Sequence, residues 1–308
     1  MLALGSIASA FLLAALLAGG GRVARIAAVA LATAALGAPF LDHAASPLAL
    51  FGASLVAATG LARVVELAGE HPARPAAWRV IQALTVVDWR GAHRAPPELS
   101  WPRAGVAVLH LVAFAALVAV GVCVRMQAGT TFLLAGWLLG AAAIWALAEG
   151  TTSLLTLALR AGGWQLPTLH DHPIASRSVG ELWGARWNLT VVRWLRGQVF
   201  VPFARAGHAR LGVFASFVVS GLFHAYTVAA GGGPWAAASM AAFFLAQGLL
   251  VAVEQQLRVT RWRRPLARAW FFAAMLVTSP LFVEPMIRIS LPTLAPSKGV
   301  IDGQPRLG

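Results

Sequence analysis

Long apolar runs separated by short polar segments form the main pattern along this chain. A membrane-spanning helix needs about 20 mostly apolar residues. Eight runs approach this length, at residues 2–20, 23–41, 48–65, 105–124, 131–149, 211–232, 234–254 and 268–289. Two long connections, 66–104 and 150–210, remain between them. The pattern predicts an all-α polytopic membrane protein with about eight transmembrane helices.

The runs group into a single integral membrane domain over residues 1–308. Within it we expect five N-terminal spans with a cytoplasmic loop, a cytoplasmic or interfacial loop, three further spans and a tail, at 1–149 (loop 66–104), 150–210, 211–289 and 290–308. The first run lacks a preceding basic segment and a clear cleavage site, so we expect a retained helix. No internal repeat is evident, which weighs against inverted-repeat transporters.

The composition agrees with this prediction and excludes a water-soluble globular protein. Hydrophobic residues make up 59% of the 308 residues and charged residues 11%, compared with roughly 25% charged in soluble domains. The formal net charge is +13, but twenty of the 24 Lys and Arg residues lie in the first, third, fifth and seventh connections. By the positive-inside rule, these connections are cytoplasmic and both termini lie outside. We attribute the basic excess to this topology, and we expect no nucleic-acid partner.

Residue usage also bears on the source and on metal chemistry. Lys298 is the only lysine and alanine is very frequent, which is typical of a GC-rich bacterial genome, so we expect a bacterial inner membrane. Cys123 is the only cysteine, which excludes an intrachain disulfide and a cysteine-based metal site. His170, Asp171 and His172 contain alternating potential ligands, but no third or fourth ligand stands at a recognisable spacing, so we expect no metal site.

The second long connection carries an amphipathic helical pattern. Ser178 and Glu181 form a capping box that predicts a helix from about Val179, and Pro202 ends or kinks it. On this helix a narrow tryptophan stripe lies beside an arginine stripe, formed by Trp183, Trp187 and Trp194 and by Arg186, Arg193 and Arg196. Asn188 lies on the opposite face, where a polar amide needs a partner. The stripes alone favour a helix anchored at the lipid headgroups.

The sixth run is apolar apart from four polar residues on one helical face. Ser216, Ser220, His224 and Thr227 follow one another at spacings of 4, 4 and 3 residues. An ionisable residue inside a membrane-spanning helix usually faces a cavity or the bundle interior, which favours a functional role for His224. The alternative is a neutral histidine hydrogen-bonded between helices. His110 is interpreted as structural, and no chemistry is assigned to Glu149, Gln247, Glu254 and Glu284.

Three segments resemble motifs of one enzyme family. Residues 173–188 (PIASRSVGELWGARWN), 217–224 (FVVSGLFH) and 278–285 (TSPLFVEP) are similar, in this order, to segments of the wax synthase branch of the membrane-bound O-acyltransferase superfamily. That branch typically has P-x-x-x-x-S-x-x-D-F-W-G-R-R-W, F-x-x-S-G-x-x-H and P-L-F-x-E-P. Two positions depart from it: Glu181 stands where Asp is usual, and Ala185 where Arg is frequent.

The resemblance implies a helical bundle with an internal chamber and transfer of an acyl group from a thioester, usually acyl-CoA, to a hydroxyl in the membrane. By the matched motifs His224 is the catalytic base and Asn188 its partner. We expect further substrate contacts from Trp183, Arg186, Trp187, Ser216, Ser220 and Thr227. Arg193 and Arg196 are candidates for the phosphates of the donor. The only cofactor we expect is acyl-CoA as a co-substrate, with none bound tightly.

The acceptor is predicted from polarity. The face around His224 offers few polar groups, and each unpaired hydroxyl of a buried sugar costs about 1–3 kcal/mol, so we expect a long-chain alcohol or a similar lipid. Diacylglycerol, a sterol and a glycan stay open as other acceptors. Two alternatives of different class also stay open: a small transporter in which His224 and the serines relay protons, and an inactive relative that binds lipid. The sequence does not fix the oligomeric state.

Overall fold

A computed structural model of the chain describes residues 2–85, 87–126 and 130–291. The predicted tail, 290–308, lies almost entirely outside the described residues. Apart from one pair of short strands, the regular elements are helical. In chain order they are α1 (Leu2–Leu17), α2 (Arg22–Ala34), η1 (Ala35–Gly37), α3 (Ala38–Leu41), α4 (Pro47–Gly69), α5 (Ala76–Leu84), η2 (Trp89–Gly91), β1 (His93–Arg94), α6 (Trp101–Arg125), α7 (Thr130–Ala161), β2 (Trp164–Gln165), η3 (Pro173–Ala175), α8 (Val179–Glu181), η4 (Leu182–Arg186), α9 (Leu189–Leu195), η5 (Arg196–Phe200), α10 (Val201–Arg205), α11 (Ala209–Leu257), η6 (Val259–Arg261) and α12 (Arg264–Ser290).

The long apolar helices confirm an all-α polytopic membrane protein. Within the described residues, six helices are long and apolar enough to cross a membrane, and α1 is a shorter apolar helix. The count is two lower than the predicted eight because α11 contains two of the predicted spans and α1 is shorter than a full span. At Gly233 the backbone leaves the helical conformation with φ 73°, and Pro234 follows. Glycine adopts a positive φ without strain, and proline donates no backbone hydrogen bond, so this pair suits a tight reversal.

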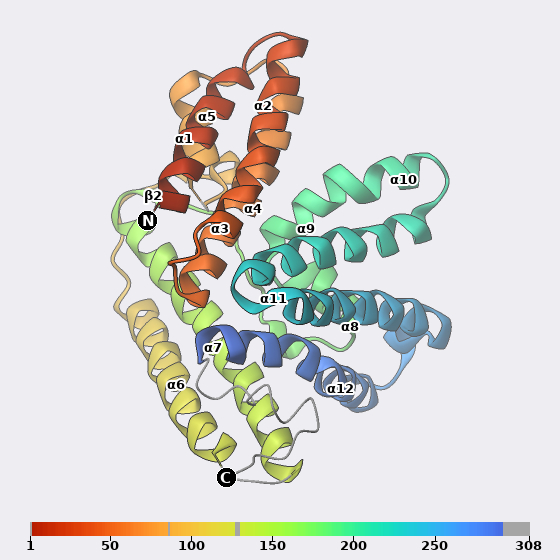
Figure 1. The fold of residues 1–308 in the computed structure, drawn as a ribbon. Helices are drawn as coiled ribbons and strands as arrows, with labels where there is room; N and C mark the ends of the chain where they lie inside the picture. The colour runs from red at the N-terminus through yellow and green to blue at the C-terminus, as the bar shows by residue number, and fades with distance from the viewer. Residues whose placement is uncertain (1, 86, 127–129, 292–308) are drawn as a thin grey trace.

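The two halves of α11 fold against each other as an antiparallel hairpin. Gly221 lies against Phe244, and Gly248 lies against Phe217. Figure 1 shows the chain reversing where α11 is labelled, with α12 beside the second half. The two predicted spans 211–232 and 234–254 therefore correspond to the two arms of this hairpin.

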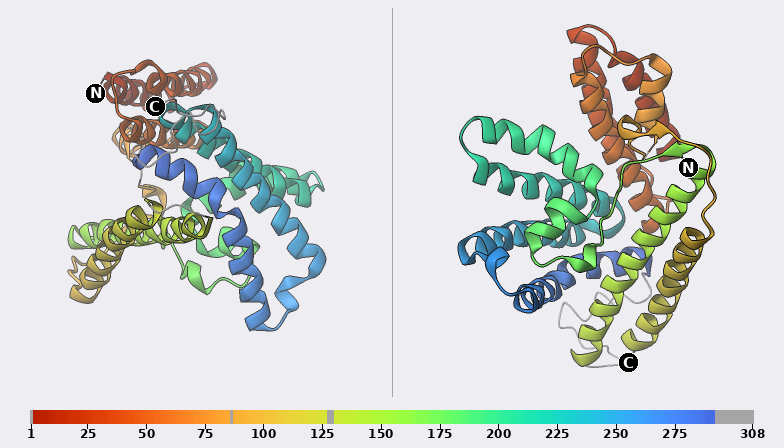
Figure 2. Two further views of the ribbon diagram at one scale, coloured as in Figure 1. Left: turned by 60° about the horizontal axis from the view of Figure 1, so that its bottom comes forward. Right: turned by 180° about the vertical axis from the view of Figure 1, so that it is seen from behind.

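The helices form three groups (Figures 1 and 2). The N-terminal group contains α1, α2, α4 and α5, and the paired α6 and α7 extend away from it. The α11 hairpin lies with α8, α9, α10 and α12, and it also packs against α4. The α11 hairpin, which contains the sixth predicted span, therefore contacts both the motif helices and the N-terminal group.

Some boundaries differ from the prediction. The helix predicted for 131–149 continues as α7 to Ala161, because nothing in the chain interrupts it before Gly162 and Gly163. A short helix, α5, also forms inside the first long connection. The two long connections then meet in an antiparallel pair of short strands, in which His93 pairs with Gln165.

Candidate active site

His224 lies in the first arm of α11 with its two ring nitrogens in different environments. Nδ1 lies 2.8 Å from the carbonyl oxygen of Ser220. A carbonyl only accepts, so Nδ1 carries the hydrogen, and in the neutral ring the lone pair is at Nε2. Within the described residues, Nε2 makes no hydrogen bond. The helix thus fixes the tautomer that leaves a basic nitrogen free.

The ring of His224 is also held by aromatic packing. It stacks on Phe244 of the second arm with 4.2 Å between ring centroids and 30° between ring planes. Trp183 also packs against Phe244, with 5.6 Å between their ring centroids. Phe244 therefore links the histidine to the motif tryptophan.

The hydroxyls on the face of His224 are mostly used within their own helix. Ser216 donates to the carbonyl of Gly212 at 2.9 Å, and Thr227 donates to the carbonyl of His224 at 2.8 Å. Ser220 is buried, with 9% of its surface exposed. The predicted polar stripe exists as a face, but it offers fewer free hydrogen-bonding groups than its composition indicates.

The motif helix begins where the capping box predicts. Ser178 is the N-cap of α8, and its Oγ accepts from the backbone N–H of Glu181 at 2.9 Å. The Glu181 carboxylate accepts from the backbone N–H of Arg177 at 2.8 Å and from the Arg186 side chain at 2.7 Å. Burial alone raises the pKa of Glu181, but these hydrogen bonds and the two arginine charges lower it below its usual value.

Glu254, on the second arm of α11, provides a further cap for this helix. Its carboxylate accepts from the backbone N–H groups of Val179 at 2.7 Å and Gly180 at 2.9 Å, and from the indole of Trp270 at 2.8 Å. A carboxylate at a helix start satisfies orphan N–H donors and the helix dipole together. Glu254 thereby fixes the motif segment to the α11 hairpin.

The sequence predicted one continuous helix from Val179 to Pro202, but the structure interrupts it. Trp187 is extended and Asn188 is left-handed, with φ 44°. Asparagine tolerates this conformation better than most residues. The break separates η4 from α9, so no single helical face runs through the whole segment.

The predicted tryptophan stripe is therefore wrong, since its three members have three different neighbours. The indole of Trp183 donates to Gln247 at 3.0 Å, Trp187 stacks on His170 at 4.5 Å, and Trp194 donates to the carbonyl of Ala62 at 3.2 Å. Each indole joins the motif segment to a different part of the protein.

Asn188 is the N-cap of α9. Its Oδ1 accepts from the backbone N–H of Val191 at 3.3 Å. Because the cap requires the oxygen there, the amide NH2 is directed elsewhere and stays available as a donor. In the described part of the chain no hydrogen bond joins Asn188 to His224. Their common chamber stays a prediction.

The three predicted arginines are placed differently. Arg186 is occupied, because its guanidinium bonds Glu181 and the carbonyl of Asp171. Arg193 is exposed and bonds the Thr190 hydroxyl at 2.9 Å. Arg196 is exposed as well. The last two are accessible to an anionic ligand as they stand.

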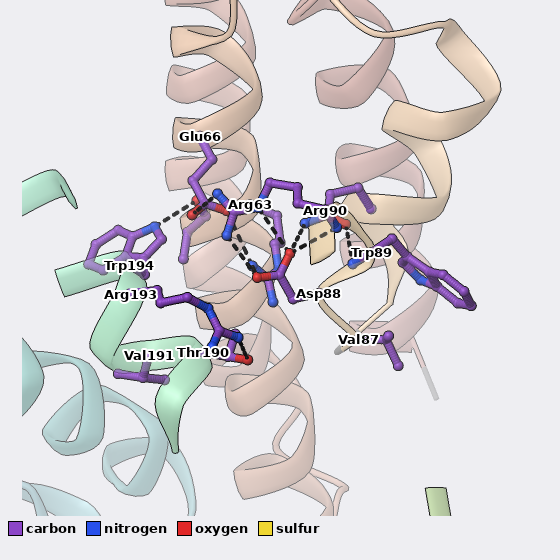
Figure 3. A network of polar contacts seen from close by, with 12 residues as sticks. Arg63, Glu66, Val87, Asp88, Trp89, Arg90, Thr190, Val191, Arg193 and Trp194 are labelled. Atoms are coloured by element: carbon purple, nitrogen blue, oxygen red, sulfur yellow. Dashed lines mark hydrogen bonds and ion pairs between the residues drawn. The ribbon is translucent and has the colours of Figure 1, made fainter. Parts of the chain in front are cut away.

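A buried network of charged side chains lies beside α9 (Figure 3). Arg90 contacts Glu66 at 2.6 Å and Asp88 at 2.9 Å, and Arg63 contacts Glu66 at 3.2 Å. Trp194 lies next to this network in Figure 3. Two arginines balance two carboxylates, so the network attaches the first long connection to α4, where α9 also docks.

Sequence reasoning left Gln247 and Glu254 without a role. The structure places both against the motif segment, since Gln247 accepts from Trp183 and donates to Thr278 at 2.8 Å. The available signal was their spacing of seven residues, which puts both on one face of an apolar span. Glu284, also unassigned, accepts from Arg125 at 2.7 Å and from Trp137 at 3.2 Å.

Two hollows are found away from His224 and Asn188. One lies between the ends of the two α11 arms and is lined by Arg210, Val213 and Gln255 among others. The other is an open groove at Arg22, Arg25 and His71. Neither joins the two candidate catalytic residues.

Comparison with known proteins agrees with this arrangement. Residues 166–246 match the model of the membrane bound O-acyl transferase family. That stretch contains the motif segment and most of the α11 hairpin, including His224. The resemblance predicted from the three motifs is thus confirmed over this region.

Curated relatives come from Arabidopsis thaliana. "Probable long-chain-alcohol O-fatty-acyltransferase 3" is 32% identical over 148 residues, which are 41% of each chain. "Probable long-chain-alcohol O-fatty-acyltransferase 7" is 33% identical over 141 residues, also 41% of each. "Acyl-CoA--sterol O-acyltransferase 1" is 34% identical over 113 residues, or 33% of each. The matched stretches thus span less than half the length of these relatives.

Proposed function

We propose that this protein transfers a fatty acyl group from acyl-CoA to the hydroxyl of a long-chain alcohol or a similar lipid, with His224 as general base. The observation that carries the proposal is the free Nε2 of His224, which results from the Nδ1 hydrogen bond to Ser220 at 2.8 Å. A fixed neutral tautomer in an apolar span has the form that proton abstraction requires.

The reaction needs no acyl-enzyme. Nε2 accepts the proton of the alcohol while the alcohol oxygen attacks the thioester carbonyl carbon. When the C–S bond breaks, the imidazolium returns this proton to the departing thiolate. The products are the ester and free CoA, and the histidine is neutral again.

Asn188 supplies the stabilising donor in this proposal. Its Oδ1 accepts from the Val191 N–H, whereas its NH2 group takes no part in the cap. An amide N–H is suited to the negative charge that develops on the thioester oxygen. Of the two roles open to Asn188, orienting the histidine and binding the oxyanion, its capping geometry favours the second.

The donor is proposed to approach from the side of the basic connections. The CoA moiety carries phosphates, and the exposed Arg193 and Arg196 lie on the motif segment. A further basic run, Arg258 to Arg268, follows the second arm of α11. Arginine binds phosphate through paired donors. With these connections cytoplasmic, soluble acyl-CoA reaches the site directly while the acyl chain enters the membrane.

The acceptor is proposed to be apolar. The hydroxyls of Ser216 and Thr227 donate to backbone carbonyls of their own helix. A polyhydroxylic acceptor would therefore find few hydrogen-bond partners near His224. An alcohol with one hydroxyl needs only the histidine. The names of the relatives include both long-chain alcohols and sterols, and a sterol also carries a single hydroxyl.

The test is to supply membranes containing the protein with labelled acyl-CoA and a panel of acceptors: hexadecanol, diacylglycerol, a sterol and a soluble sugar. We expect a labelled wax-type ester from hexadecanol, with little product from the sugar. Transfer only to the sugar would contradict the proposal that the acceptor is apolar. Proton or solute flux in liposomes without any acyl transfer would overturn the reaction and favour a transporter.

A further inference from the structure

We propose that His170, held by Glu149, is a positioning residue that fixes the backbone turn presenting Asn188. The effect on catalysis rests on the proposed function, whereas the effect on the turn does not. His170 lies in the second long connection and Glu149 lies inside α7, both outside the three motifs.

His170 and Glu149 form a buried pair. Nδ1 of His170 lies 3.2 Å from Oε1 of Glu149, and the two side chains are 6% and 20% exposed. Within the described residues neither atom makes a hydrogen bond, so the pair is an ion-pair contact by distance and not a hydrogen bond. Because both side chains are largely buried and in contact, each restricts the position of the other.

The ring of His170 also lies flat on Trp187, the residue before Asn188. The ring centroids are 4.5 Å apart and the ring planes differ by 13°. His170 therefore contacts a carboxylate of α7 and stacks on a motif tryptophan. It restrains Trp187, which is extended at the end of η4.

Main-chain hydrogen bonds on both sides of Asn188 run to the segment that carries His170. The N–H of Leu189 donates to the carbonyl of Leu169, and the N–H of Asp171 donates to the carbonyl of Arg186, both at 2.8 Å. The chain on either side of Asn188 is therefore clamped to the neighbours of His170.

This clamp explains how a strained turn is held. Asn188 has φ 44°, a conformation that costs energy outside glycine and persists only where its surroundings enforce it. The direction of its amide follows from this backbone geometry. Movement of the 169–171 segment would therefore move the proposed oxyanion donor.

The experiment compares His170→Asn with the matched variant His172→Asn. His172 is exposed and lies two residues away, also in a left-handed conformation that Asn tolerates. Hydrogen exchange is measured on peptides covering residues 186–191 of the full-length protein in detergent. We expect exchange there to accelerate about tenfold or more in His170→Asn and to stay unchanged in His172→Asn. His170→Phe, which keeps the stack, should lie between.

Kinetics then separate positioning from general damage. We expect His170→Asn to lower kcat more than it changes KM, and to have no further effect when Asn188 is already alanine. Unchanged exchange at 186–191, or an acceleration spread equally over α11, would overturn the inference. If Asn188→Ala is fully active, the proposed role of Asn188 fails, and the exchange result alone still decides the role of His170.

Discussion

His224 and Phe244 stack face to face across the two arms of the α11 hairpin, with 4.2 Å between their ring centroids. Phe244 is 1% exposed and contacts Trp183 of the motif segment. The hydrogen bond to Ser220 fixes which nitrogen of His224 is basic, and Phe244 fixes where the ring lies. Both restraints come from the α11 hairpin, whose two arms are joined at Gly233.

Phe244→Ala should lower turnover by roughly 10-fold to 100-fold, because a misplaced catalytic group loses rate steeply. Phe272→Ala, at a site on α12 that is 45% exposed, is the matched control and should be nearly silent. The assay is ester formation by purified protein at saturating substrates. Equal rates for both variants would mean that the stack does not position His224.

Glu254→Gln should destabilise the protein and reduce activity, because the carboxylate caps Val179 and Gly180 and also accepts from Trp270. Loss of charge-assisted hydrogen bonds at such a buried site costs about 1–3 kcal/mol. Thermal unfolding in detergent measures this. Glu98→Gln, which affects a half-exposed pair with Arg160, is the control and should shift the Tm little. A Tm equally insensitive to both changes would count against the cap.

The double variant Trp183→Phe/Gln247→Leu should lose less free energy of unfolding than the sum of the losses of the two single variants. Each single change strands one partner of the 3.0 Å hydrogen bond, whereas the double variant removes both polar groups. We expect a coupling of about 1 kcal/mol in a double-mutant cycle on the free energy of unfolding. Strict additivity would show that the bond contributes nothing to docking the motif segment.

Asp88→Asn should destabilise the network beside α9 by about 3–5 kcal/mol, as expected when one member of a buried ion pair is removed. Burial by itself raises the pKa of Asp88, but the hydrogen bond from Arg90 and the charges of Arg63 and Arg90 lower the pKa well below its usual value.

The pH dependence follows from that direction. A depressed pKa adds stability above the unfolded value, near 4, and this stability disappears as the pH falls toward the folded value. Wild-type protein should therefore lose Tm below about pH 4 more steeply than Asp88→Asn. Parallel Tm profiles of the two proteins would contradict this account.

The sequence predicted the long apolar helices and the motif start well, although not the number of helices of spanning length, because both features depend on local signals. Apolar runs located the α11 arms, and the Ser178 cap located the beginning of α8. The break at Asn188 was missed because helical periodicity assumes a regular backbone, and a left-handed residue is fixed by tertiary contacts. The partners of Gln247, Glu254 and His170 come from remote segments, so no local pattern specifies them.

The most direct test of the central claim is the rate of ester formation by His224→Ala. The measurement uses purified protein in liposomes with labelled acyl-CoA and hexadecanol, and His43→Ala, at an exposed site, serves as the control. Loss of a general base should reduce turnover by about 10² or more while the variant stays monodisperse and binds donor. Near-wild-type turnover in a well-folded His224→Ala protein would contradict the assignment.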